Sequence, residues 1–158
     1  MSKIIVLVGL PGAKKTTWAK DYQLANGSYK IVSFDAIREM LYGRYDYREK
    51  DEEMIKYIGL STVSKLIISK HDVIIDDSML VLTRFQRAYL VKFLRDMQPM
   101  FGTMQISAVS FPHLPEHRGL RKADPRGLPA EHWDSVFDKM LSIYEPMNDK
   151  ETFDLLWR

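Results

Sequence analysis

The feature that most constrains the fold of this 158-residue chain is an apolar run followed at once by a glycine-containing turn. Residues 4–8, IIVLV, are rich in β-branched side chains and show no polar alternation, which is typical of a strand buried on both faces of a sheet. Residues 9–18, GLPGAKKTTW, come next and open a helical stretch that Asn26 and Gly27 end. We therefore expect a strand, a loop and a helix in direct succession.

The loop matches the pattern G-x-x-x-x-G-K-[ST] at Gly9, Lys15 and Thr16, while Lys14 stands where the second glycine belongs. In such a loop, backbone N–H groups at a helix N-terminus surround phosphate oxygens, the lysine reaches the outer phosphates and the hydroxyl binds Mg²⁺. The pattern predicts Thr16 as the metal ligand. The residues predicted to bind a nucleotide are Gly9, Gly12, Ala13, Lys14, Lys15, Thr16 and Thr17.

Lys14 leaves three interpretations of this loop open. The residue keeps its backbone N–H, and its charge favours phosphate. If the position requires a positive φ, a non-glycine residue there costs about 1–2 kcal/mol, which a folded domain can absorb. The loop is an active phosphate site, a nucleotide-binding loop with impaired or absent catalysis, or a chance match.

The rest of the chain alternates between strand and helix patterns. Apolar, β-branched segments predict strands at 29–34, 73–75, 105–111 and 152–157. Helices are predicted at 36–42, 52–69, 84–97 and 130–144, with Thr83 as an N-cap. Residues 112–129 are rich in Pro, Gly, Arg and Lys and predict an irregular segment with one helical turn or two. We expect one three-layer α/β domain over residues 1–158, with a mainly parallel sheet.

Composition excludes several classes of protein. A hydrophobic content of 46% with 28% charged residues is typical of a globular domain, and a net charge of +2 does not by itself indicate a nucleic-acid partner. There are no cysteines, so disulfides and thiolate metal sites are excluded. The apolar runs are too short to cross a bilayer, and the N-terminus lacks the pattern of a signal peptide. We expect a soluble, intracellular (cytoplasmic) protein with no membrane partner.

Polar side chains directly follow predicted strands. Asp35 and Asp77 come after strands, as Gly9 does, and the carboxyl ends of parallel strands form the ligand crevice in such sheets. One interpretation of Asp35 is a helix N-cap. Arg38 lies three residues later on the same helix face, and one interpretation of it is a partner in a surface ion pair. Because strand side chains alternate, one of Asp76 and Asp77 should face the crevice and the other should face away.

The segment EHRGLRKADPRGLP, residues 116–129, concentrates positive charge. We expect Arg118 and Arg121 to stabilise a phosphate, with Arg126 as the next candidate; the alternative is a solvated basic loop. Residues 44–48 interleave arginines with tyrosines, which either stack on bases or pack against the neighbouring helix.

Together these segments resemble the P-loop kinases of the polynucleotide 5′-kinase type. KIIVLVGLPGAKKTTWAK is similar to that family's first strand, loop and helix, and VSFDAIRE to its Asp-x-x-Arg motif. DVIIDDSML and YEPMNDKETFDLLWR resemble its third strand and its last loop and strand, so the resemblance covers almost the whole chain. The departure is Lys14, where the family has glycine.

The resemblance implies a P-loop NTPase fold, with residues 112–129 as a short basic lid, and transfer of the γ-phosphate of ATP or another NTP to a 5′-hydroxyl end of DNA or RNA. It implies that Lys15 contacts the β- and γ-phosphates, Thr16 binds Mg²⁺ and Asp35 is the general base. Arg38 and Asp77 would position the acceptor. The implied lid residues are Arg118, Arg121 and Arg126. Two other functions stay open: a kinase for a nucleoside, nucleotide or sugar, and a catalytically impaired module that binds nucleotides or nucleic-acid ends.

Overall fold

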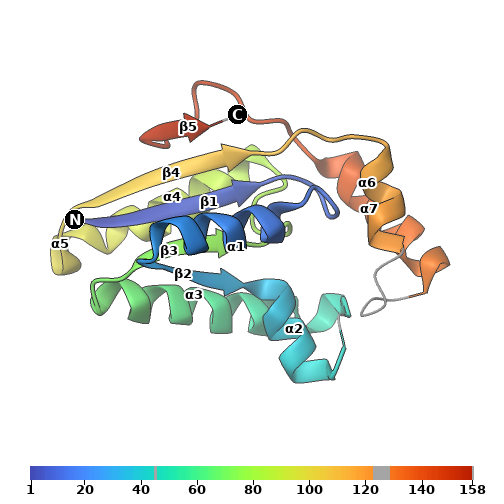
Figure 1. Ribbon diagram of the computed structural model, residues 1–158, viewed down its shortest axis with the longest axis horizontal. Helices are drawn as coiled ribbons and strands as arrows, with labels where there is room; N and C mark the ends of the chain where they lie inside the picture. Colours follow the sequence, from blue (N-terminus) through green and yellow to red (C-terminus); the bar gives the residue numbers. More distant parts are fainter. Residues whose placement is uncertain (45, 123–128, 158) are drawn as a thin grey trace.

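The computed structural model describes residues 1–44, 46–122 and 129–157, and these contain a five-stranded sheet (Figure 1). Its strands lie in the order β2-β3-β1-β4-β5, and every neighbouring pair is parallel. The strands are β1 (Ser2–Val8), β2 (Tyr29–Ser33), β3 (Asp72–Asp76), β4 (Met104–Ser110) and β5 (Leu155–Trp157). With helices on both faces, this is the three-layer P-loop NTPase α/β fold that the sequence predicts.

Helices cover both faces of the sheet and its carboxyl edge. They are α1 (Lys15–Asn26), α2 (Phe34–Tyr42), the 3₁₀ turn η1 (Glu49–Asp51), α3 (Glu52–Ile68), α4 (Arg84–Asp96), α5 (Gln98–Phe101), α6 (Glu116–Lys122) and α7 (Ala130–Ile143). In Figure 1 the strand arrows point towards α2, α6 and α7, so these helices lie at the edge where parallel strands place a ligand. No helix in the described ranges is long and apolar enough to span a bilayer.

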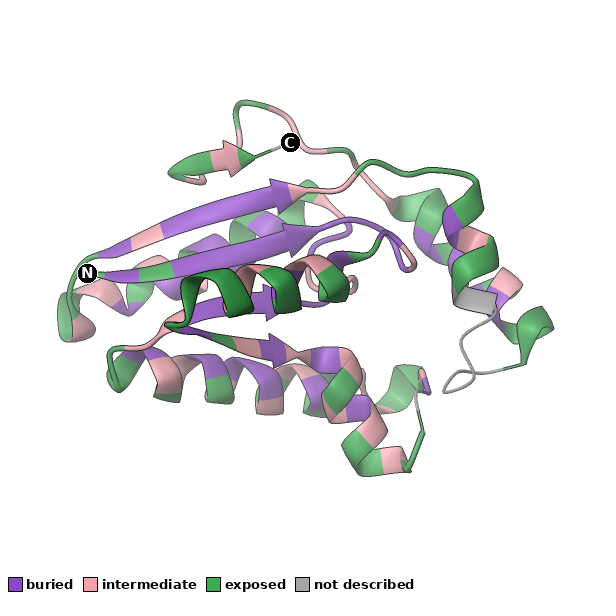
Figure 2. Cartoon of the chain, in the orientation of Figure 1, coloured by how far each residue is buried: buried purple, intermediate pink, exposed green. Residues whose placement is uncertain are grey.

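The central strand is buried on both sides, which explains its unbroken apolar sequence (Figure 2). Ile4, Val6 and Val8 pack with apolar residues of α3 and α4 on one face. Ile5 and Leu7 pack with α1 on the other face. The helix α7 joins the carboxyl edge through a separate cluster, in which its buried aromatic side chains pack on the phosphate loop and on the segment just before α4. That cluster contains Leu10, Leu82, Trp133, Val136, Phe137 and Met140.

Several element ends differ from the prediction for identifiable reasons. Strand β2 stops at Ser33 because the Ser33 hydroxyl accepts a hydrogen bond from Ala36 N and caps α2, so that cap is not Asp35. Thr83 caps α4 as predicted, in a capping box with Gln86. The last strand begins at Leu155 instead of residue 152. Just before it, the Asp154 carboxylate accepts a 2.7 Å hydrogen bond from Ile106 N.

Candidate functional site

The loop after β1 has the backbone conformation that the pattern demands. Gly12 has φ +82°, and Lys14 has φ 62° and ψ 24°, in the left-handed region. Lys14 thus adopts the conformation for which glycine is preferred, at a cost of about 1–2 kcal/mol. Helix α1 therefore begins at Lys15, and Trp18 N donates to Lys14 O over 3.0 Å.

Lys15 is held across the loop by oxygens. Its side chain is buried, and Nζ donates to the backbone carbonyls of Gly9 and Leu10 over 2.9 and 3.0 Å. It also donates to the Ser78 hydroxyl over 2.9 Å. The ammonium is therefore fixed between the phosphate loop and the end of β3. Ser78 was not predicted as a site residue, although the run Asp76-Asp77-Ser78 after a strand was the signal for it.

Thr16 and Asp76 are paired beside this lysine. The Thr16 hydroxyl donates to Asp76 Oδ2 over 2.6 Å, and Asp76 is buried at the end of β3. A hydroxyl oxygen and a carboxylate oxygen therefore lie side by side, and Mg²⁺ prefers oxygen ligands of this kind.

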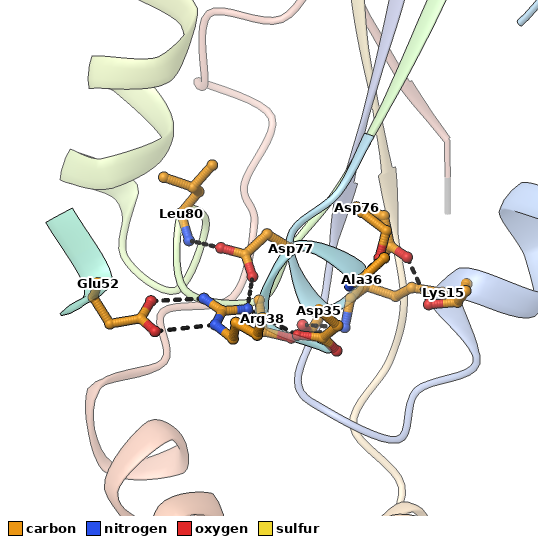
Figure 3. A network of polar contacts seen from close by, with 12 residues as sticks. Lys15, Asp35, Ala36, Arg38, Glu52, Asp76, Asp77 and Leu80 are labelled. Atoms are coloured by element: carbon orange, nitrogen blue, oxygen red, sulfur yellow. Dashed lines mark hydrogen bonds and ion pairs between the residues drawn. The ribbon is translucent and has the colours of Figure 1, made fainter. Parts of the chain in front are cut away.

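A buried arginine joins three elements at the other side of the site (Figure 3). Arg38 on α2 donates to both carboxylate oxygens of Glu52 over 3.0 and 2.6 Å. Its Nη1 also donates to Asp35 Oδ1 over 2.8 Å and to Asp77 Oδ1 over 3.1 Å. Since Arg38 is 1% exposed, it is not the surface ion pair that was one of its two interpretations. Glu52 was missed, because it follows Arg38 by 14 residues and has no motif of its own.

Asp77 is buried next to this arginine, and its other oxygen accepts from Leu80 N over 3.1 Å. Burial raises the pKa of Asp77 to about 6, although the nearby Arg38 charge opposes the shift. Asp77 is therefore a carboxyl group that titrates close to neutral pH.

The phosphate loop and the carboxylates Asp35, Asp76 and Asp77 line one cavity of about 420 Å³. Its walls combine the phosphate loop and the start of α1 with the start of α2, the end of β3 and one residue of α6: Pro11, Gly12, Lys14, Lys15, Thr16, Thr17, Asp35, Asp76, Asp77, Ser78 and Leu120. Both Asp76 and Asp77 line it, so the expectation that one would face away was wrong. Strand β3 ends at Asp76, and the alternation of a strand does not extend to Asp77.

The predicted lid residues differ in what surrounds them. Arg118 on α6 donates to Asp134 over 3.3 Å and to Asp138, and its guanidinium lies 4.8 Å from the centre of the Phe137 ring. Arg118 thus contacts α7 and does not line the cavity. The backbone of Arg121 belongs to α6. Arg126 lies outside the described residues.

The Tyr/Arg segment forms contacts within the protein. The Arg48 guanidinium lies 4.2 Å from the centre of the Tyr42 ring and donates to Asp46 over 3.1 Å. Arg44 donates to the same carboxylate over 3.5 Å. Arg48 therefore packs on α2, and both arginines pair with a carboxylate of their own segment. Tyr45 lies outside the described residues.

The chain is similar to several solved structures. It aligns with a fungal RNA kinase at a TM-score of 0.64 and 14% identity, covering 98% of this chain and 72% of that one. A chain of the Pnkp1/Rnl/Hen1 RNA repair complex gives 0.60 and 22%, covering 96% of this chain and 50% of that one. A gluconokinase from Sinorhizobium meliloti 1021 gives 0.55 and 17%, covering 99% and 81%.

At these identities the structures establish the fold alone, and the present chain spans only half of the matched chain from the repair complex. No curated protein sequence matches the chain. A family model described as "AAA domain" matches residues 4–147, which include the phosphate loop, the Arg38 network and α7. The chain therefore belongs to this AAA domain family, AAA_33, and has a P-loop kinase-type domain.

Proposed function

We propose that the chain transfers the γ-phosphate of ATP to the 5′-hydroxyl end of DNA or RNA. The observation that carries the proposal is the 2.8 Å pair between Asp35 and Arg38. Asp35 lines the same cavity as Lys15 and Thr16, and Arg38 lines the neighbouring cavity between α3 and α4. A carboxylate that is paired with a guanidinium thus shares a cavity with a phosphate-binding loop, where an acceptor must approach the donor.

On the donor side, the loop N–H groups and the start of α1 would bind the phosphates of ATP. Lys15 would contact the β- and γ-phosphates from its position between Gly9, Leu10 and Ser78. Thr16 would bind Mg²⁺, with Asp76 orienting its hydroxyl. When bound, Mg²⁺ supplies positive charge that neutralises the phosphate oxygens.

On the acceptor side, Asp35 would take the proton of the attacking 5′-hydroxyl. The hydroxyl oxygen then bonds to the γ-phosphorus, the bond to the bridging oxygen breaks and ADP leaves. Arg38 would contact an acceptor phosphate by exchanging carboxylate partners for it, because its guanidinium is paired with carboxylates in the structure and also matches phosphate oxygens in a bidentate way. Asp77 would position Arg38 through their 3.1 Å pair. Arg118, Arg121 and Arg126 remain the proposed lid cations.

Two of the similar solved structures are kinases for different acceptors, and each supports a different proposal for this chain. The fungal RNA kinase favours the polynucleotide proposal, whereas the gluconokinase favours a small acceptor on the same fold. A chain that binds ATP but transfers no phosphate would match the impaired-module alternative. Incubation with γ-labelled ATP, Mg²⁺ and either hydroxyl-ended oligonucleotides, nucleosides or sugar acids separates the three.

The decisive variant is Asp35→Asn. It is expected to lower phosphate transfer to an oligonucleotide by about 100- to 10,000-fold, because it removes the base, and to leave ATP binding intact. Asp21→Asn removes an exposed carboxylate from α1 and is the matched control. Retained transfer in Asp35→Asn would exclude Asp35 as the base. Label on a sugar acid but on no oligonucleotide would exclude the polynucleotide acceptor.

A further inference from the structure

Two cavities between α3 and α4 form one continuous groove, which we call the α3–α4 groove. The cavity nearer the site, about 360 Å³, is lined by Arg38 and Asp77 at one end. The farther cavity, about 280 Å³, extends past Tyr57 to Phe93. Four residues line both cavities: Glu53, Lys56, Leu60 and Tyr89. Since Asp77 lines both this groove and the phosphate-loop cavity, the groove ends next to the proposed site.

Aromatic rings line this groove at regular intervals. Phe85, Tyr89 and Phe93 recur at every fourth position of α4, so they share one face and follow each other about every 6 Å along the helix. Phe85 is 79% exposed and Tyr89 53% exposed, and Tyr57 on α3 is 75% exposed. Contiguous exposed rings of this kind indicate a binding surface, because core packing would have buried them.

The charges of the groove favour a flat, uncharged ligand group over a phosphate. Lys56 Nζ lies 4.9 Å from the centre of the Tyr89 ring, so one cation faces an aromatic surface. Glu53 lies alongside, and Glu52 is paired with Arg38. Because carboxylates lie next to the lysine, a ligand phosphate would gain little electrostatic attraction in this groove. The exposed rings of Phe85 and Tyr89 provide stacking instead.

We propose that the α3–α4 groove binds the unpaired bases of a single-stranded acceptor by stacking them on Tyr89 and Phe85. The proposal rests on the proposed function, because the 5′ end of that strand would lie at Asp35. Stacking suits every base, so the groove sets the preference for a single strand and not for a sequence. The first nucleotide would lie next to Arg38, and the following bases would extend along α4.

The test measures binding of 3′-fluorescein-labelled, hydroxyl-ended oligothymidylate to the full chain by fluorescence anisotropy. A second probe of equal length has a thymidine at the 5′ end followed by abasic sites. We expect wild type to bind the base-bearing probe at least about fivefold more tightly than the abasic one. Tyr89→Ala and Phe85→Ala should each remove most of that difference, and Tyr89→Phe should keep it. Trp157→Ala, which removes an exposed ring from β5, is the control.

Salt provides a second readout. The ratio of the Kd of Tyr89→Ala to that of wild type should stay constant as salt rises, because stacking releases no counterions. Equal binding of the two probes by wild type, unchanged binding by Tyr89→Ala, or a ratio that falls with salt overturns the proposal. Thermal melting shows whether each variant is folded. Binding needs no catalysis, so base-dependent binding without phosphate transfer to the oligonucleotide would support the groove and exclude transfer to a polynucleotide end.

Discussion

The backbone carbonyl of His117 lies directly against Gly12, so close that a Cβ on the glycine would fall well inside van der Waals contact with that oxygen. Gly12 belongs to the phosphate loop and His117 to α6, the helix of the predicted lid. The loop and α6 are therefore in backbone contact, and the absence of a side chain at Gly12 is what permits it.

Gly12→Ala should displace α6 from the loop. The added methyl group meets the His117 carbonyl, and the φ of +82° is itself unfavourable for alanine by about 1–2 kcal/mol. We expect a lower melting temperature and at least tenfold weaker binding of ATP, measured by calorimetry. Gly27 has a φ of +62° but open space where a Cβ would lie. Gly27→Ala therefore adds backbone strain without a steric contact, and so separates these two causes. If both variants weaken ATP binding equally, the contact with α6 has no part in it.

Lys14→Gly should have opposite effects on stability and on nucleotide affinity. Glycine relieves the left-handed conformation of Lys14, so the free energy of unfolding should rise by about 1 kcal/mol. It also removes an exposed ammonium from the cavity wall, so the Kd for ATP should increase several-fold. Lys14→Gln keeps the strain and removes the charge, and should weaken ATP binding without stabilising the fold. Phosphate transfer that is present only in Lys14→Gly would instead identify Lys14 as the cause of an impaired site.

Asp77 should make stability fall as pH rises. Its pKa lies at about 6 in the folded state, above the ordinary value of 3.8, so the folded state holds this proton to higher pH than the unfolded state. Below pH 4 both states are protonated and the group has no effect. Between pH 4 and 6 ionisation in the unfolded state alone destabilises the fold, by an amount on the order of 3 kcal/mol. Urea unfolding at several pH values measures it. Asp77→Asn should lack this dependence, apart from a constant offset for the lost Arg38 partner, and an unchanged slope would contradict the assignment.

The parts of the site that the sequence predicted are those that follow from strand ends. The phosphate loop, Asp35 and Asp77 each follow a strand, and parallel pairing brings strand ends to one edge whatever the loops between them do. Side chains that reach the site from elsewhere were not predictable in this way. Glu52 starts α3 after a loop with no motif, and only its bidentate pair with Arg38 identifies it.

The α3–α4 groove could not be predicted from the sequence either. Phe85 and Tyr89 share the helical spacing of core residues, and the pattern of α4 does not distinguish the face towards the sheet from its flank. Tertiary packing decides this, because Leu90 and Leu94 fill the space against the sheet and leave the two rings exposed. Likewise, the basic composition of residues 116–129 predicts a cation near phosphate, but the carboxylates that hold Arg118 come from α7.

Arg118 should exchange its partners on α7 for phosphate during turnover. Its contacts with Asp134 and Asp138 are partly exposed, and ion pairs of this kind are weak enough to be replaced by a triphosphate. Asp138→Asn removes one competitor and should raise kcat for phosphate transfer. Arg118→Ala should lower kcat by at least about 100-fold, because a guanidinium at the transferring group stabilises its charge. Single-turnover transfer of labelled phosphate measures both, with Asp149→Asn as a control for charge. If Arg118→Ala and Asp138→Asn both lower the melting temperature and leave kcat unchanged, Arg118 serves only to hold α6 on α7.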